Sequence, residues 1–183
     1  AEMSGFAHYD KGWHGTATYG TFGAAAAAAK LLSLDAEQTV TALGIAATQA
    51  AGLKSMFGTM CKPLHAGKAA SNGLLAARLA KKGFTSRMDA IECAQGFAAT
   101  QADGFRALPV SLAHNQKLAV EENLFKYHAS CYLTHAGIEA VKSLRDEHDV
   151  KVQQIKSVQQ FVPKTHFSVC NIAEPTTGLE TKF

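Results

Sequence analysis

The chain has 183 residues, of which 47% are hydrophobic and 18% are charged, and its formal net charge is +3. This composition is that of a globular protein and excludes a disordered chain. The charges are scattered, without the basic run expected for a nucleic acid or membrane surface, and the longest apolar stretch, residues 23–29, is much shorter than the roughly 20 residues of a transmembrane helix.

The first part of the chain is expected to be helical. A first helix is predicted over residues 20–34, because it contains a run of alanines, the strongest helix formers, and the glycines before it indicate a turn. Asp35, followed by Gln38, predicts a capping box at the start of a second helix. This helix is expected to end near Gly52, and residues 52–62 are expected to form a loop or a broken helix.

Pro63 is typical of the first turn of a helix, and the next helix is predicted to run to about Lys82 and to end at Gly83. Small residues recur along it at helical spacing, which allows another backbone to approach closely. They are Ala66, Ala69, Ala70, Gly73, Ala76, Ala77 and Ala80.

A change of composition is expected near residue 110. Before it, Ser86 and Asp89 predict the cap of a short helix over residues 87–95. Residues 103–114 have the composition of a turn.

Beyond this point the sequence predicts a helix over about 134–148 and β-branched, alternating strands over about 150–162 and 165–171. The predicted fold class is therefore mainly α, and α+β overall. An alanine-rich helical portion would occupy residues 1–110, and the start of an α/β unit would occupy residues 111–183.

His14, in the glycine-rich segment before the first predicted helix, is a candidate functional residue. A histidine on such a turn is free to project, and helix N-termini favour anions. The alternative is an exposed loop histidine without a catalytic role.

Lys62 and His65 form a second candidate cluster. With Pro63 as the first helical residue, Lys62 would lie at the cap and His65 in the first turn, where lysine, imidazole and free amides suit a carboxylate or a phosphate. The alternative is a solvated helix start. Nothing in the local sequence marks Cys61 as an activated nucleophile.

A third cluster contains Lys126, His128 and Ser130, ahead of the helix predicted from about residue 134. The pattern His128-x2-Cys131-x3-His135 suggests zinc only weakly, because a closed structural site needs a fourth ligand and no distant pair has matching spacing. A lysine and a polar turn before a helix suit an anion better. Glycine-rich nucleotide motifs are also lacking, so no cofactor is predicted.

At these clusters the sequence resembles the MmgE/PrpD family. The segment Gly12-Trp13-His14-Gly15-Thr16, the run from Gly20 to Leu32, and Cys61 to Ala70 are similar to the family segments "GFHPT…GTFGAAAAAAKLLGL" and "TKPLHAGRAA". The stretch from Lys126 to His135 is similar more loosely, and Asp149 to Phe183 resembles the run into a "TGLEAKFS" strand. Trp13, Gly15 and Cys61 depart from the usual Phe, Pro and Thr.

The resemblance implies a cofactor-independent lyase for a small polycarboxylic acid, most closely a 2-methylcitrate dehydratase of propionate catabolism. A cis-aconitate-type decarboxylase and an iminodisuccinate-type epimerase are the alternatives. It implies catalytic roles for His14, Lys62 and Lys126, and substrate binding by His65, His128 and Ser130. Residues 1–110 would be part of the family's helical domain, and residues 111–183 the beginning of its α/β lid domain.

Because family members are more than twice this length, the chain is expected to be a central fragment that is inactive alone. A non-catalytic structural or interaction fragment is the competing hypothesis. The resemblance also implies a homodimer, with no nucleic-acid or membrane partner. The four widely spread cysteines favour reduced thiols and a cytoplasmic location, or the mitochondrial matrix in a eukaryote.

Overall fold

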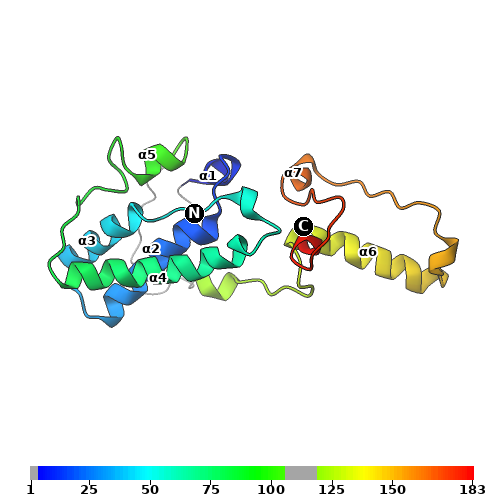
Figure 1. Cartoon of the computed structure of the whole chain (residues 1–183), viewed down its shortest axis with the longest axis horizontal. Helices are drawn as coiled ribbons and strands as arrows, with labels where there is room; N and C mark the ends of the chain where they lie inside the picture. The colour runs from blue at the N-terminus through cyan, green and yellow to red at the C-terminus, as the bar shows by residue number, and fades with distance from the viewer. Residues whose placement is uncertain (1–3, 106–118) are drawn as a thin grey trace. The chain divides into compact units, whose positions relative to one another are not determined.

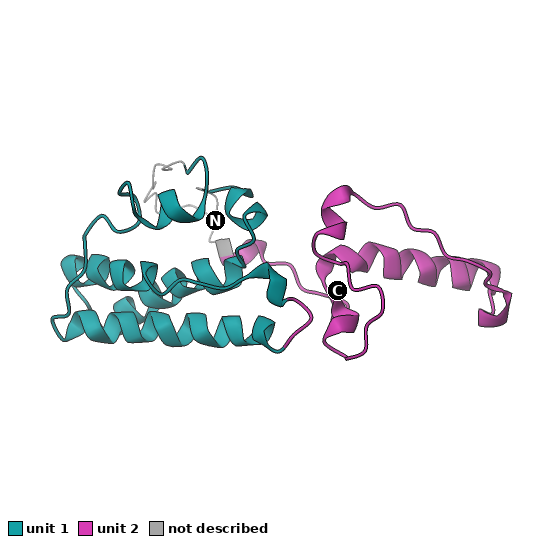
Figure 2. Cartoon of the chain, turned by 45° about the horizontal axis from the view of Figure 1, so that its top comes forward, with its two compact units in different colours: residues 1–56, 60–111 teal, residues 57–59, 112–183 magenta. Residues whose placement is uncertain are grey.

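A computed structural model describes residues 4–105 and 119–183 of the chain. The chain divides into two compact units, the first made of Ala1–Met56 and Met60–Ser111, the second of Phe57–Thr59 and Leu112–Phe183 (Figure 2). The predicted change of composition near residue 110 and part of the predicted turn at 103–114 lie outside the described residues. None of the described helices is both long and apolar enough to cross a bilayer.

The first unit is a group of helices in which α2, α3 and α4 pack against one another (Figure 1). In chain order the unit contains α1 (Ala7–Asp10), α2 (Gly15–Leu31), α3 (Ala36–Ala47), the 3-10 turn η1 (Lys54–Met56), α4 (Cys61–Lys81) and α5 (Phe97–Gln101).

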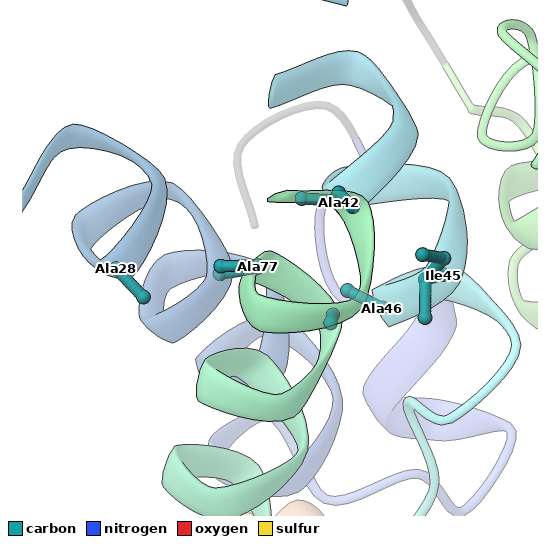
Figure 3. Close-up of a cluster of buried hydrophobic side chains, with 8 residues drawn as sticks. Ala28, Ala42, Ile45, Ala46 and Ala77 are labelled. Carbon is teal, nitrogen blue, oxygen red and sulfur yellow. The ribbon is translucent and has the colours of Figure 1, made fainter. Parts of the chain in front are cut away.

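The buried hydrophobic cluster of the first unit is made of alanines and Ile45 (Figure 3). Larger residues, among them Phe22, Leu43 and Leu79, are partly buried and pack against it. The contact between α2 and α4 is so close that a Cβ on Gly73 would lie 2.5 Å from the Cβ of Ala24 and 2.7 Å from the carbonyl oxygen of Thr21. At Gly73 the helices therefore approach each other through backbone and methyl groups.

The expected small-residue stripe on α4 provides much of this contact. Its buried members are Ala69, Gly73, Ala76, Ala77 and Ala80, whereas Ala66 and Ala70 are exposed. Since α2 and α3 of the same chain contact α4, the buried part of the stripe is not available to a partner subunit. The homodimer stays a prediction.

The predicted start of the second helix is confirmed. An oxygen of the Asp35 carboxylate accepts the N–H of Gln38 at 2.8 Å, and the Gln38 side chain accepts the N–H of Asp35 at 3.3 Å. The helix carrying Pro63 is also confirmed, and it is followed by Gly83 in the left-handed region, with φ of +83°. Such a conformation favours glycine.

The predictions for two other segments of the first unit are corrected by the structure. Helix α2 begins at Gly15, five residues before the predicted start at residue 20. Residues 87–95 form turns in place of the predicted helix. The proposed capping pair has other partners, because the Ser86 hydroxyl donates to the carbonyl of Thr41 at 3.0 Å and the Asp89 carboxylate binds Arg87 at 2.8 Å.

The second unit is built on the long helix α6 (Tyr132–His148), close to the predicted 134–148. Its other elements are short: η2 (Ala119–Glu122), η3 (Val152–Gln154), α7 (Lys164–Phe167) and η4 (Glu180–Lys182). Asp149 ends α6 in the left-handed conformation, with φ of +46°.

The strands predicted over about 150–162 and 165–171 are not present in the described structure. Residues 155–163 are extended or irregular, and α7 occupies part of the second predicted strand. A strand needs a neighbour for its backbone N–H and C=O groups, and no described segment of this unit pairs with these residues. The β-branched pattern was therefore not sufficient, and the α/β lid domain stays a prediction.

Candidate functional site

His14 is the N-cap residue of α2, where its extended backbone turns into the helix. Its N–H donates to the carbonyl of Gly52 at 2.9 Å, and its own carbonyl accepts the N–H of Ala17 at 2.9 Å. Next to this bond, Trp13 and Leu53 form an isolated antiparallel bridge. The side chain is only 8% exposed, so the interpretation as an exposed loop histidine is wrong.

Gly52 lets His14 and α4 come together. A Cβ at this position would lie 2.3 Å from the Cβ of Ala17 and 3.2 Å from the Cδ2 of His65. No side chain fits there without moving backbone. From the sequence, Gly52 is expected only as the end of a helix, because a close approach between distant segments leaves no local signal.

His65 lies on α4, which begins at Cys61, so it stands just past the first turn and Lys62 lies within that turn rather than at the cap. The Nδ1 atoms of His14 and His65 are 2.8 Å apart and hydrogen-bonded. The ring centroids are 5.1 Å apart, and His65 is 9% exposed. The structure thus brings together His14 and His65, which the sequence placed in separate clusters.

A hydrogen bond between two Nδ1 atoms fixes the tautomers of the neutral pair. One ring must carry its proton on Nδ1 and donate, and the other must offer a lone pair on Nδ1 and accept. The first ring then has a basic Nε2, and the second an Nε2–H. The pair therefore combines one proton acceptor and one proton donor. When the basic Nε2 gains a proton and the other ring loses its Nε2 proton, movement of the shared proton between the Nδ1 atoms keeps both rings neutral and exchanges the two roles.

The surroundings keep this pair neutral at pH 7. Burial, then the charge of His65, then that of Lys62 lower the pKa of His14 to about 4. Burial and, secondarily, the Lys62 ammonium also lower the pKa of His65. A neutral imidazole pair beside a lysine is suited to an anionic ligand, since the lysine supplies the positive charge while an imidazole remains free to accept a proton.

His8 is hydrogen-bonded to α2, the helix that His14 caps, and was not singled out from the sequence. It is 1% exposed and its ring contacts those of Trp13, Tyr19 and Phe97. Its Nδ1 lies 3.1 Å from the carbonyl of Gln101, which can only accept, so Nδ1 carries the proton. Nε2 then accepts from the Thr18 hydroxyl at 2.8 Å, on the first turns of α2.

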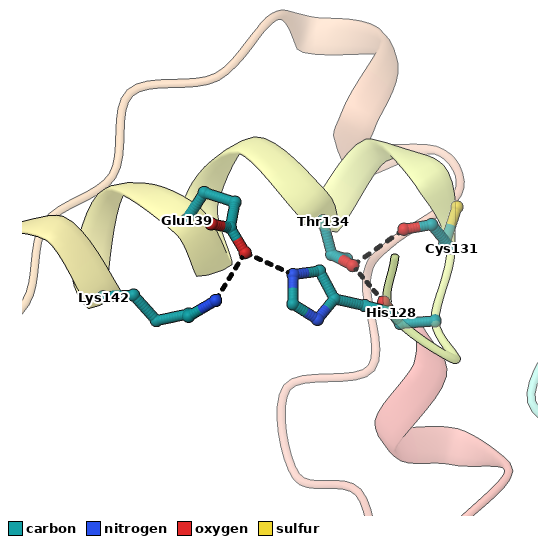
Figure 4. A network of polar contacts seen from close by, with 6 residues as sticks. His128, Cys131, Thr134, Glu139 and Lys142 are labelled. Carbon is teal, nitrogen blue, oxygen red and sulfur yellow. Dashed lines mark hydrogen bonds and ion pairs between the residues drawn. The ribbon is translucent and has the colours of Figure 1, made fainter. Parts of the chain in front are cut away.

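Lys126, His128 and Ser130 belong to the second unit and lie in the segment that leads into α6. The Lys126 ammonium donates to the carbonyl of Ser130 at 2.8 Å, and the hydroxyls of Ser130 and Thr134 are 2.8 Å apart. Nε2 of His128 is 2.6 Å from a carboxylate oxygen of Glu139 (Figure 4). The residues of the predicted third cluster therefore belong to two sets of hydrogen bonds, one that joins Lys126, Ser130 and Thr134 and one that joins His128 and Glu139.

Glu139 binds His128 and also Lys142, which lies on the next turn of α6. Lys142 donates to the same Glu139 oxygen at 2.9 Å, and the hydrogen bonds from Lys142 and His128 hold the pKa of the Glu139 carboxyl below its usual range. His135 is buried between the rings of His128 and Tyr132, and its Nε2 has no hydrogen-bond partner in the described structure. Among the residues that the structure describes, no three His, Cys, Asp or Glu side chains gather as metal ligands.

Comparison with known proteins agrees with the family resemblance of the sequence segments. The profile of the MmgE/PrpD N-terminal domain matches residues 1–108. A cis-aconitate decarboxylase of Aspergillus terreus is 32% identical over 154 residues, which cover 76% of this chain and 30% of that protein. The Homo sapiens cis-aconitate decarboxylase is 33% identical over 136 residues, covering 74% of this chain and 28% of the relative. The chain thus spans about 30% of the length of these curated relatives.

Proposed function

Because the chain belongs to the MmgE/PrpD family, we propose that it carries part of the active site of a lyase for a small polycarboxylic acid, with decarboxylation of a cis-aconitate-like acid as its reaction. The chain matches several cis-aconitate decarboxylases at 32 to 33% identity. This similarity favours decarboxylation over the 2-methylcitrate dehydration expected from the sequence.

The observation that carries the proposal is the hydrogen bond between His14 and His65 beside Lys62. When a carboxylate leaves as CO2, the electron pair of the broken C–C bond stays on the carbon skeleton and must be protonated. The Nε2–H of one imidazole would supply that proton, and the pair would regain it from solvent. General acid catalysis of this kind contributes about 100- to 10,000-fold in rate.

Lys62 would hold a substrate carboxylate and stabilise the negative charge that develops as CO2 leaves. Lys126 would act in the same way, with His128 and Ser130 binding further carboxylate oxygens through their hydrogen-bonding groups. These roles need only imidazole, ammonium and hydroxyl groups, so the proposal invokes no cofactor.

The second candidate is dehydration of a 2-methylcitrate-like acid, and the same histidine pair favours it. A hydro-lyase removes a proton next to a carboxylate and protonates a departing hydroxyl group. The basic Nε2 and the Nε2–H of the pair could serve these two steps. Epimerisation next to a carboxylate requires the same removal and return of a proton.

Product analysis would separate these reactions. The full natural protein is incubated with cis-aconitate, 2-methylcitrate and iminodisuccinate in parallel, and the products are identified by NMR. We expect loss of CO2 from cis-aconitate, with the protein carrying Lys62→Ala as the inactive comparison. Conversion of 2-methylcitrate alone would select the dehydratase, and failure to convert any of the three acids would contradict the polycarboxylate proposal.

A further inference from the structure

His8, on α1, contacts the residues on both sides of His14. Before His14, the carbonyl of His8 accepts the N–H of Trp13 at 3.4 Å, and the two rings stack with their centroids 6.1 Å apart and 16° between their planes. After His14, Nε2 of His8 lies 2.8 Å from the hydroxyl oxygen of Thr18. Nδ1 lies 3.1 Å from the carbonyl of Gln101. One buried ring therefore ties α1 and α5 to the start of α2.

Thr18 in turn binds the backbone of His14. Its N–H donates to the His14 carbonyl at 3.2 Å, and its hydroxyl oxygen lies 3.4 Å from the same carbonyl oxygen. The hydroxyl has a single proton, which it can donate either to this carbonyl or to Nε2 of His8. Burial lowers the pKa of His8, so the ring is neutral at pH 7, and with its proton on Nδ1 it has a lone pair on Nε2. The shorter contact, 2.8 Å against 3.4 Å, assigns the Thr18 proton to His8.

Without an acceptor on His8, the Thr18 hydroxyl would turn to the His14 carbonyl. Such a bond from a threonine to the carbonyl four residues earlier bends a helix. The bend would fall on the N-cap residue of α2, whose ring is hydrogen-bonded to His65 through Nδ1 atoms 2.8 Å apart. A rotation of the His14 peptide group would therefore displace its ring from that of His65.

We propose that His8 is a positioning residue for the His14–His65 pair. Its Nε2 keeps the Thr18 hydroxyl away from the His14 carbonyl, and its ring packs on Trp13, so that the backbone of His14 is held from both sides. The consequence for catalysis rests on the proposed lyase function, whereas the effect on the geometry of the pair does not.

Two substitutions separate the two hydrogen bonds of the His8 ring. In His8→Gln the amide oxygen can take the place of Nε2 and accept from Thr18, whereas in His8→Asn the amide N–H can take the place of Nδ1 and donate to Gln101. Both variants replace the ring with an amide and lose the stacking on Trp13. A difference between them therefore reports on the hydrogen bond with Thr18.

The first readout is the pKa of His14, followed by NMR titration of the 183-residue chain. Burial is the largest cause of the low pKa of this residue, so a displaced ring should titrate at higher pH. We expect His8→Asn to raise the pKa of His14 from about 4 towards the ordinary value of about 6.5, and His8→Gln to leave it at about 4. Equal shifts in the two variants, or no shift in either, would overturn the proposal.

The second readout is the activity of the full natural protein with cis-aconitate. His8→Asn should lower kcat about 10- to 100-fold with little change in KM, as expected for a misplaced catalytic group, while His8→Gln retains most of the activity. A wild-type kcat in His8→Asn would overturn the catalytic consequence. If the unsubstituted protein converts none of the acids tested, the lyase proposal fails, and the titration of His14 still decides whether His8 positions the pair.

A measurement on the unsubstituted chain decides the case in which both variants fail to fold. The nitrogen NMR shifts of the His8 ring should show a protonated Nδ1 and an unprotonated Nε2. A proton on Nε2 would overturn the proposal, because Thr18 would then accept from His8 and its own proton would be donated to the His14 carbonyl.

Discussion

Gly52 holds His14 by its carbonyl group, which accepts the His14 N–H at 2.9 Å, and its missing side chain leaves the space that the His65 ring occupies. One residue thus sets both the backbone of one histidine and the position of the other. The proton-sharing pair depends on this loop as much as on the two helices that carry the rings.

Substitution Gly52→Ala should destabilise the chain by about 1–3 kcal/mol, because the new Cβ would lie 2.3 Å from that of Ala17 and the backbone must shift. Denaturant unfolding measures the loss. The shift should also separate His14 from His65 and bring the pKa of His14, followed by NMR, back towards its ordinary value.

Gly67→Ala is the matched control, since Gly67 lies within α4 and a Cβ there would have no neighbour within 4 Å. It should stabilise the helix by about 0.5–1 kcal/mol. Equal effects of the two substitutions would contradict the role given to Gly52.

Stability should fall as the pH drops from about 6.5 towards about 4. The folded chain protonates His14 at about pH 4 and the unfolded chain near 6.5, so the unfolded state binds more protons in this interval. Above it both states are neutral at this residue and the contribution to pH dependence vanishes.

The free energy of unfolding at about pH 7 and about pH 5 provides the measurement. His14→Gln should reduce the difference between the two values, because it removes the group whose pKa is lowered on folding. An unaltered pH dependence in His14→Gln would show that this residue is not protonated differently on unfolding.

Loss of either histidine of the pair should abolish most of the activity of the full natural protein. We expect His14→Gln and His65→Gln each to lower kcat about 100- to 10,000-fold, in the range of general acid–base catalysis. Because the two rings act as a unit, the double variant should be little worse than either single one. Multiplicative losses would indicate two independent roles.

Lys62→Ala should lower kcat about 100-fold or more without unfolding the protein, since the lost contact acts on charge that develops during the reaction. Lys68→Ala, at an exposed position on the same helix, should retain full activity. Initial rates with far-UV circular dichroism as a folding check compare the two. A wild-type rate in Lys62→Ala would exclude the carboxylate-binding role.

Thr18→Val should cost about 1–3 kcal/mol of stability, because it leaves the buried Nε2 of His8 without its donor. Thr21→Val is the matched comparison. Thr21 is equally buried on α2, but its hydroxyl donates only to the carbonyl of Ala17 in its own helix. Thermal or denaturant unfolding should show a smaller loss of stability in Thr21→Val than in Thr18→Val. A larger loss in Thr21→Val would contradict the conclusion that the hydrogen bond between His8 and Thr18 stabilises α2.

Local chemistry was enough to predict the helices whose ends depend on a few adjacent residues. The Asp35–Gln38 capping box, the helix around Pro63 and the end at Gly83 all follow from residues that act within one or two turns. The stripe on α4 was also visible, because close helix contact needs small residues at fixed spacing. Membership of the MmgE/PrpD family was likewise predicted from the sequence segments.

Features that depend on contacts between distant segments were not predictable in this way. The burial of His14 depends on Gly52 and on α4, and no local pattern pairs it with His65. His8 lies in a short segment without hydrophobic periodicity, so nothing marked it as a buried hydrogen-bonding residue. Residues 150–162 have a strand-like pattern, but pairing requires a neighbour that the pattern itself cannot supply.

The close contact of α2 with α4 restricts how this part of the chain can evolve. At Gly73 even a methyl group would meet the backbone of α2, at 2.5 Å from the N atom of Ala25. A larger residue on α2 would therefore require a smaller one on α4. At position 73 this is impossible, because glycine is already the smallest residue. Among homologues, the residues facing each other here should accordingly vary in concert or not at all, while the exposed side of α4 diverges freely.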